Sequence, residues 1–126
     1  MKKKLACAFA AFAMLLPLVA RAHHGWAAFD SQNNVTFKGV VTDFHFVSPH
    51  SVVDFEVKDA NGKVEIWQGE LTSALNLSRK GWTAVSLETG DEITVSGHKA
   101  RSGVHTMRIM KLTTKKGVTL EAGDEK

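Results

Sequence analysis

Alternating apolar and polar residues predict that most of this chain folds as β-strands. The segment 35–47 (VTFKGVVTDFHFV) is rich in Val, Phe and Thr and predicts a long first strand. Its apolar residues change phase between Phe37 and Phe44, so we expect a bulge or bend at Gly39 or near Asp43. A strand bent in this way can pair with a different neighbour along each of its halves.

Four further strands and one short helix follow along the chain. Turn sequences such as DANG and ETGD separate the strands. The segment 72–81 (TSALNLSRKG) predicts a helix of about two turns, with Thr72 or Ser73 as the N-cap and Gly81 just after the helix end. The further predicted strands cover residues 53–57, 63–71, 92–97 and 104–114.

The element order β-β-β-α-β-β predicts an all-β domain with one short helix. A long first strand and a helix between strands three and four are typical of the OB-fold, a small five-stranded barrel. We therefore predict an OB-like barrel over residues 35–120, with an N-terminal arm at 23–34 and a flexible polar tail at 121–126. A plain meander or a small sandwich is the alternative architecture.

The first 22 residues predict a signal peptide. Lys2, Lys3 and Lys4 precede an apolar run, and Ala20-Arg21-Ala22 fits the small-x-small pattern of signal cleavage. The apolar run is short of the roughly 20 residues that cross a bilayer as a helix. We expect cleavage after Ala22, a periplasmic or secreted protein, and no stable membrane span after cleavage. An uncleaved N-terminal anchor is the alternative.

Removal of residues 1–22 changes the charge of the chain. Four of its 16 Lys and Arg lie in the predicted signal, which leaves 12 against 13 Asp and Glu and turns a formal net charge of +3 into −1. Because a slightly acidic exported domain is not typical of nucleic-acid binding, we expect no nucleic-acid partner. The single cysteine, Cys7, also lies in the signal, so the mature domain has no thiol for a disulfide or a metal.

Two adjacent histidines after the predicted cleavage site are the strongest candidate for a metal site. Cleavage after Ala22 makes His23 the N-terminus, and its α-amino group and its own Nδ1 can then close a chelate ring on a metal ion. Amine and imidazole nitrogens suit copper, so copper is the candidate cofactor and His24 a further ligand. A flexible tail with two ordinary histidines is the alternative.

Three residues of the predicted barrel are candidates to complete such a site. His50 follows Pro49 at the corner between the first two strands, where the proline restricts the backbone. Glu70 offers a carboxylate at the end of the third strand, and Met107 offers a thioether. The alternatives are a turn histidine that caps a backbone carbonyl, a carboxylate near a helix N-terminus, and a methionine that fills the core.

The three tryptophans are candidates for a surface that binds a ligand or partner. Core packing is more typical for Trp67 and Trp82, whereas Trp26 is close enough to the predicted N-terminus to anchor the arm on the barrel. Exposure of Trp67 and Trp82 would favour a binding platform, and burial of both would count against one.

Several short motifs resemble a family of small exported bacterial proteins whose domain has no known function. The motifs are AHHGW…FD, SPH, IWQGEL and SRKGWTAVSLETGDEITVSGHKARSG…M, and together they extend over essentially the whole mature chain. The resemblance implies export, a common fold and a mature N-terminal His-His pair. The family's corner reads Asn-Pro-His, whereas this chain has Ser48 in place of the asparagine. The resemblance implies no activity.

Together these observations predict a periplasmic copper-binding protein that captures or delivers the ion through His23. Catalytic patterns such as G-x-S-x-G, H-E-x-x-H or a phosphate-binding glycine loop are missing from the sequence, so we do not expect an enzyme. The alternatives are a metal-free OB-like interaction module that binds an envelope protein or a glycan, and an accessory subunit of an exported enzyme.

Overall fold

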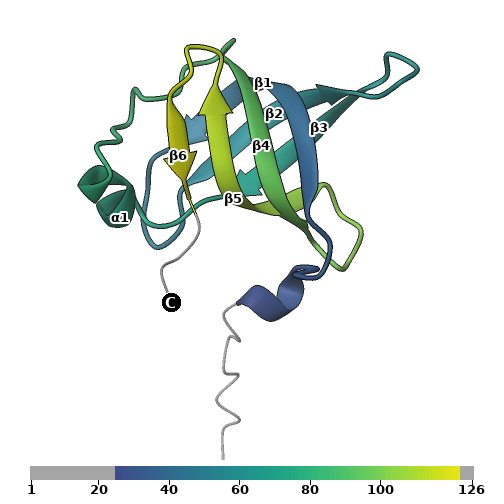
Figure 1. The fold of residues 1–126 in the computed structure, drawn as a ribbon, viewed down its shortest axis with the longest axis horizontal. Helices are drawn as coiled ribbons and strands as arrows, with labels where there is room; N and C mark the ends of the chain where they lie inside the picture. The colour runs from purple at the N-terminus through teal and green to yellow at the C-terminus, as the bar shows by residue number, and fades with distance from the viewer. Residues whose placement is uncertain (1–24, 123–126) are drawn as a thin grey trace, which may run out of the picture.

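The computed structural model describes residues 25–122 and is built mainly from β-strands with one short α-helix (Figure 1). This confirms the predicted fold class. In chain order the elements are the 3-10 helix η1 (Trp26–Ala28), β1 (Val35–His45), β2 (Val52–Lys58), β3 (Val64–Glu70), α1 (Ala74–Arg79), β4 (Glu92–Lys99), β5 (Thr106–Thr114) and β6 (Thr119–Glu121).

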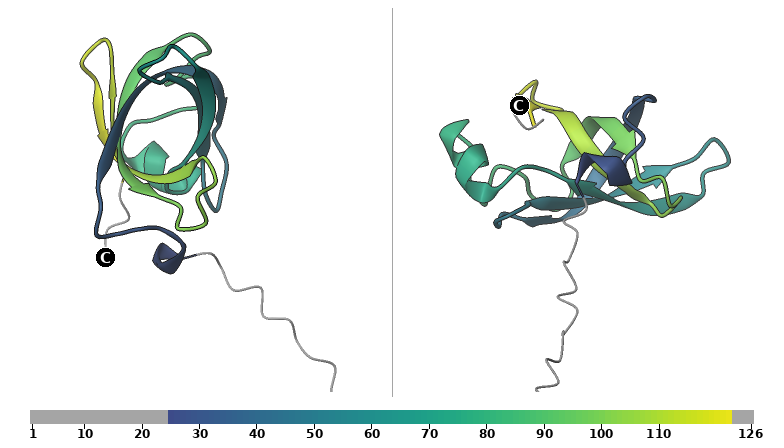
Figure 2. Two further views of the ribbon diagram at one scale, coloured as in Figure 1. Left: turned by 90° about the vertical axis from the view of Figure 1, so that its right-hand side faces the viewer. Right: turned by 90° about the horizontal axis from the view of Figure 1, so that it is seen from below.

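Five of the strands close into an OB-like barrel. The strand order is β3-β2-β1-β4-β5-β6, and a parallel pairing between β3 and β5 closes the ring (Figure 2). The first half of β1 pairs with β4 and its second half pairs with β2, with Val40 in both pairings. A register shift between Val41 and Asp43 bends the strand there, which confirms the irregularity predicted near Asp43.

Local capping fixes both ends of α1. The Ser73 side chain accepts a hydrogen bond from the Asn76 backbone N–H at 3.2 Å, so Ser73 and not Thr72 is the N-cap. Beyond the helix, Gly81 has a φ of +85°, a conformation that glycine adopts without strain. The helix therefore begins and ends where the sequence predicts.

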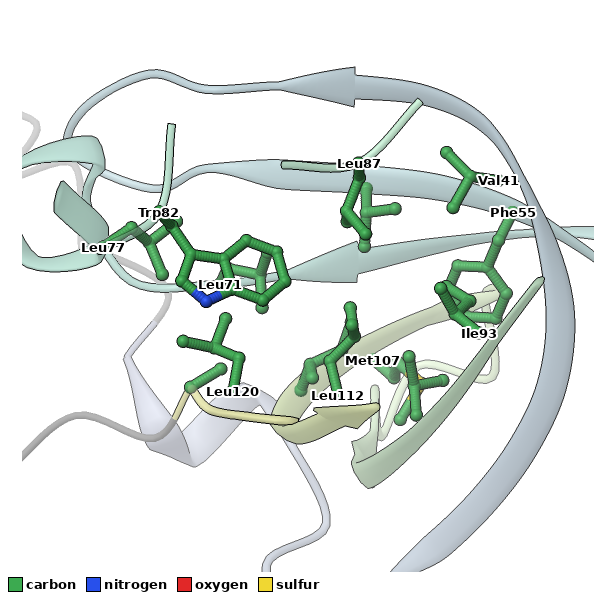
Figure 3. Packing of buried hydrophobic residues seen from close by; sticks show 14 of the residues in the cluster. Val41, Phe55, Leu71, Leu77, Trp82, Leu87, Ile93, Met107, Leu112 and Leu120 are labelled. Carbon is green, nitrogen blue, oxygen red and sulfur yellow. The ribbon is translucent and has the colours of Figure 1, made fainter. Parts of the chain in front are cut away.

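The barrel interior and the space beneath α1 share one cluster of buried apolar side chains (Figure 3). The cluster forms because every second residue of each strand points inward. Its largest fully buried members are Phe55, Leu71, Leu77, Met107, Ile109 and Leu112. Burial of each such side chain contributes about 1.5–3 kcal/mol, so this core is the main source of stability in a domain without cysteine.

The C-terminal end of the fold extends further than predicted. Residues 119–121 form β6, and Leu120 and Ala122 are buried against the barrel. The predicted flexible tail at 121–126 is therefore wrong for residues 121 and 122, because Glu121 belongs to β6 and the Ala122 side chain is buried in the core. The predicted signal at 1–22, the histidines His23 and His24 and the last four residues lie outside the described residues. No helix in the described part of the chain has the length and apolar character to span a membrane.

Candidate functional site

The N-terminal arm packs against the turn between β4 and β5. Phe29 is buried, and its neighbour Asp30 donates its backbone N–H to the Lys99 carbonyl at 2.9 Å. On the other side, the Arg101 backbone N–H donates to the Ala28 carbonyl at 2.9 Å. These contacts fix η1, at the start of the described chain, on the end of the barrel (Figure 1).

A charged contact supports this docking. The Asn33 side-chain amide donates to Asp30 at 2.7 Å, and this bond is the main reason that the pKa of the Asp30 carboxyl lies below its usual value. The Gln32 backbone N–H and the charges of Arg101 and His98 lower this pKa further, against the effect of desolvation. Asp30 is therefore ionised at neutral pH and faces the Arg101 guanidinium at 3.9 Å.

Arg108 is a charged residue beneath the arm and is only 4% exposed. It lies near the start of β5 with its side chain on the outer face of the barrel, and Trp26 covers it. The Arg108 guanidinium carbon is 5.6 Å from the centre of the Trp26 ring, within the range of a cation–π contact. His98, the β4 neighbour of Arg108, meets the Trp26 ring edge-on at 6.4 Å between ring centres.

The corner between β1 and β2 brings His50 to the same place. Ser51 is fully buried, and its hydroxyl donates to the Val47 carbonyl at 2.9 Å, which closes the corner. The Ser51 backbone also bonds to Leu71 and Thr72, just after β3. The neighbouring His50 is thereby held beside Arg108, whose Nη1 lies 3.3 Å from His50 Nδ1 and donates to the Leu71 carbonyl at 3.2 Å.

This contact selects the tautomer of the neutral His50 imidazole. Arginine has donors and no acceptor, so Nδ1 of His50 must accept the hydrogen bond with its lone pair. The neutral imidazole then carries its proton on Nε2. A metal ion that binds Nδ1 must displace Arg108, and the positive guanidinium also opposes the approach of a dication. Arg108 therefore competes with a metal ion for Nδ1 of His50.

Glu70 and Met107 differ in their access to this site. Glu70 is half-buried and lies directly opposite Arg108 in the parallel pairing of β3 with β5, on the same outer face. Met107 is fully buried inside the barrel, because it precedes Arg108 in β5 and neighbouring side chains of a strand point to opposite faces. Met107 is therefore not a neighbour of His50, and its prediction as a ligand there is corrected.

The tryptophans do not form a common surface. Trp67 and Trp82 are only 5% and 6% exposed, so the predicted platform is wrong for both of them. Trp67 points inward from β3, where its ring contacts Phe37 and stacks on His105 with 4.8 Å between ring centres. Trp26 is the exposed one of the three, at 43%, and it packs on the barrel as described above.

The structure adds two residues that the sequence analysis did not single out. Ser51 holds the corner, and Arg108 connects Trp26, His50 and the end of β3. A charged residue flanked by apolar ones in the run MRIM was the available signal for Arg108, but its partners are far away in sequence. Within residues 25–122, no group of three or more His, Cys, Asp or Glu side chains is arranged to hold a metal ion.

Comparison with known proteins identifies the family. The family described as "Family of unknown function (DUF6152)" matches residues 12–108, which is most of the chain. The chain belongs to this family. Membership in DUF6152 confirms the resemblance to a family without a known function, and it assigns no activity. No curated protein matches the chain.

Several solved structures have a similar fold. One is a tRNA fluorescent labeling enzyme (16% identity, TM-score 0.44), with 68% of this chain and 18% of that chain covered. Another is the mitochondrial single-stranded DNA binding protein Rim1 from S. cerevisiae (9% identity, TM-score 0.45), with 72% of this chain and 97% of that chain covered. A third is a ZRD-deleted mutant of TiaS in complex with agmatine (19% identity, TM-score 0.44), with 77% of this chain and 24% of that chain covered. These likenesses concern the fold alone.

Proposed function

We propose that this DUF6152 protein is an exported copper-binding protein whose first ligands are the α-amino group and imidazole of mature His23. The supporting observation is that Arg108 contacts both Trp26 and His50. The Trp26 ring covers the Arg108 guanidinium, and His50 Nδ1 lies beside Arg108 Nη1. His23 precedes Trp26 by three residues, a link that spans at most about 11 Å. A copper ion on His23 is thus within reach of the barrel residues around Arg108.

The donor types favour copper in its oxidised form. The amine, His23, His24 and His50 offer nitrogen atoms, which Cu(II) prefers in tetragonal arrangements, and Glu70 offers an oxygen on the same face of the barrel. The mature chain has no cysteine to select softer ions. The proposed role is capture or delivery of the ion, not catalysis.

The first test is the mass of the mature protein, followed by titration with Cu(II) against a competing chelator. We expect a mature mass that starts at His23 and one tightly bound ion. Selective acetylation of the α-amino group should weaken binding on the order of 100-fold or more, because the chelate then loses the amine nitrogen, which binds intramolecularly. His23→Ala should have a similar effect.

His45→Ala is the matched control, because His45 is an exposed histidine of the barrel that already faces Asp43 and Asp54. Its copper affinity should equal that of the wild type. A mature protein that starts at another residue, or an acetylated protein with undiminished affinity, would contradict the proposal. A metal-free interaction module would then be the better explanation, and its partner would be sought among envelope proteins.

The contribution of His50 is tested separately through Arg108. If copper recruits His50, Arg108→Met removes a competing donor and a positive charge, so we expect tighter copper binding, by about tenfold. The double variant Arg108→Met/His50→Ala should lose this gain. Chelator competition measures both affinities, and near-ultraviolet circular dichroism checks that Trp26 keeps an ordered environment. Equal affinities of the single and double variants would remove His50 from the ligand set.

A further inference from the structure

A lysine-rich groove crosses the barrel away from the arm and from the corner that holds His50. It consists of two adjoining cavities of about 740 and 560 Å³, which share Glu92, Thr114 and Lys115 in their walls. The larger cavity lies between the segment that follows α1 and the hairpin of β5 and β6, which run side by side in Figure 1. The smaller one continues over β1, β2 and β4.

Positive charge exceeds negative charge along this groove. Its walls contain Lys38, Lys58, Lys80, Lys115 and Lys116 against Glu56, Asp91 and Glu92. Lys115 is paired with Glu92, and Lys80 donates to the Glu121 carbonyl at 3.0 Å. Lys38, Lys58 and Lys116 make no ion pair within residues 25–122. The walls of the groove therefore carry two more positive than negative charges, in a domain whose mature net charge we expect to be slightly negative.

The other polar groups of the groove narrow the class of ligand. Hydroxyls of Ser86, Thr114 and Thr119 and the carboxylates of Glu56 and Asp91 lie in the same walls. Such groups exchange hydrogen bonds with sugar hydroxyls. The combined volume of the two cavities exceeds what a single small anion fills.

We propose that this groove binds an acidic oligosaccharide, in which the unpaired lysines meet sugar carboxylates and the hydroxyls and acids meet sugar hydroxyls. OB barrels are a scaffold that accommodates oligosaccharides. The proposed groove site shares no residue with the copper site proposed above. An experiment that contradicts one of the two proposals therefore leaves the other unaffected.

Binding of hexagalacturonate to the mature protein, measured by isothermal calorimetry, tests the proposal. The variant Lys38→Gln/Lys58→Gln/Lys116→Gln should bind about tenfold more weakly, the loss expected when three exposed ionic contacts are removed. Added salt should weaken wild-type binding in the same direction, because it screens exposed charges. Thermal melting verifies that the variant folds.

The control variant Lys63→Gln/Arg79→Gln/Lys111→Gln removes the same charge from exposed positions outside the groove and should bind like the wild type. Equal weakening of both variants would mean that net charge and not the groove attracts the ligand, which overturns the proposal. Equal binding of the neutral maltohexaose, tighter binding of oligo-dT, or no binding of hexagalacturonate would also overturn it.

Discussion

Replacement of Gly97 by alanine is expected to lower the free energy of unfolding by about 3 kcal/mol, the upper part of the usual range for an overpacked core position. A Cβ at this position would lie 1.9 Å from the Arg108 carbonyl oxygen and 3.1 Å from the Ile109 Cα. Both are backbone atoms of β5, so the clash is relieved only if the two strands separate. Urea unfolding of the two proteins measures the difference.

Gly69→Ala is the matched comparison, because Gly69 is also a buried strand glycine. The atom nearest to its added Cβ is Cδ1 of Ile109, the far end of a flexible side chain that can rotate away. We expect a smaller loss for Gly69→Ala than for Gly97→Ala. The opposite order would show that the close approach of β4 and β5 is not what requires a glycine at position 97.

Gly97 also bears on the candidate site. The register shift between β4 and β5 lies between Ser96 and Gly97, and after it His98 pairs with Arg108 beneath Trp26. A backbone displaced at Gly97 shifts this pair. The Gly97→Ala protein should therefore also show altered Trp26 fluorescence under conditions in which it is still folded.

Met107→Ala is expected to cost about 2–5 kcal/mol of stability, the range for truncation of a fully buried methionine. Met107 is 0% exposed and belongs to the central cluster of the barrel (Figure 3). The closed ring of strands cannot collapse into the space left by the side chain, so a cavity remains. For a domain of this size, the loss lowers the melting temperature by about 10 °C or more.

Met107→Leu distinguishes the two roles considered for this residue. Leucine keeps the volume but removes the sulfur, so we expect less than about 1.5 kcal/mol of destabilisation and no change in copper affinity. Weaker copper binding by the leucine variant would indicate that Met107 is a copper ligand and would contradict its position inside the barrel.

The sequence by itself predicted the elements of the fold, because their signals are local. The caps of α1 at Ser73 and Gly81, the phase change near Asp43 and the order of the first five strands all depend on residues close together along the chain. Even so, β6 was missed, since three residues are too few to establish an alternating pattern.

Only the tertiary structure decided which side chains meet. Arg108 contacts His50 across 58 positions of sequence and Trp26 across a still longer interval. Closure of the barrel by β3 and β5 brings Arg108 to His50, and docking of the arm on the turn between β4 and β5 brings Trp26 over Arg108. The same closure places Met107 inside the barrel, one residue from Arg108 on its outer face. The alternation of a strand predicts that two such neighbours face opposite ways, but not which way is inward, because that depends on the strands with which they pair.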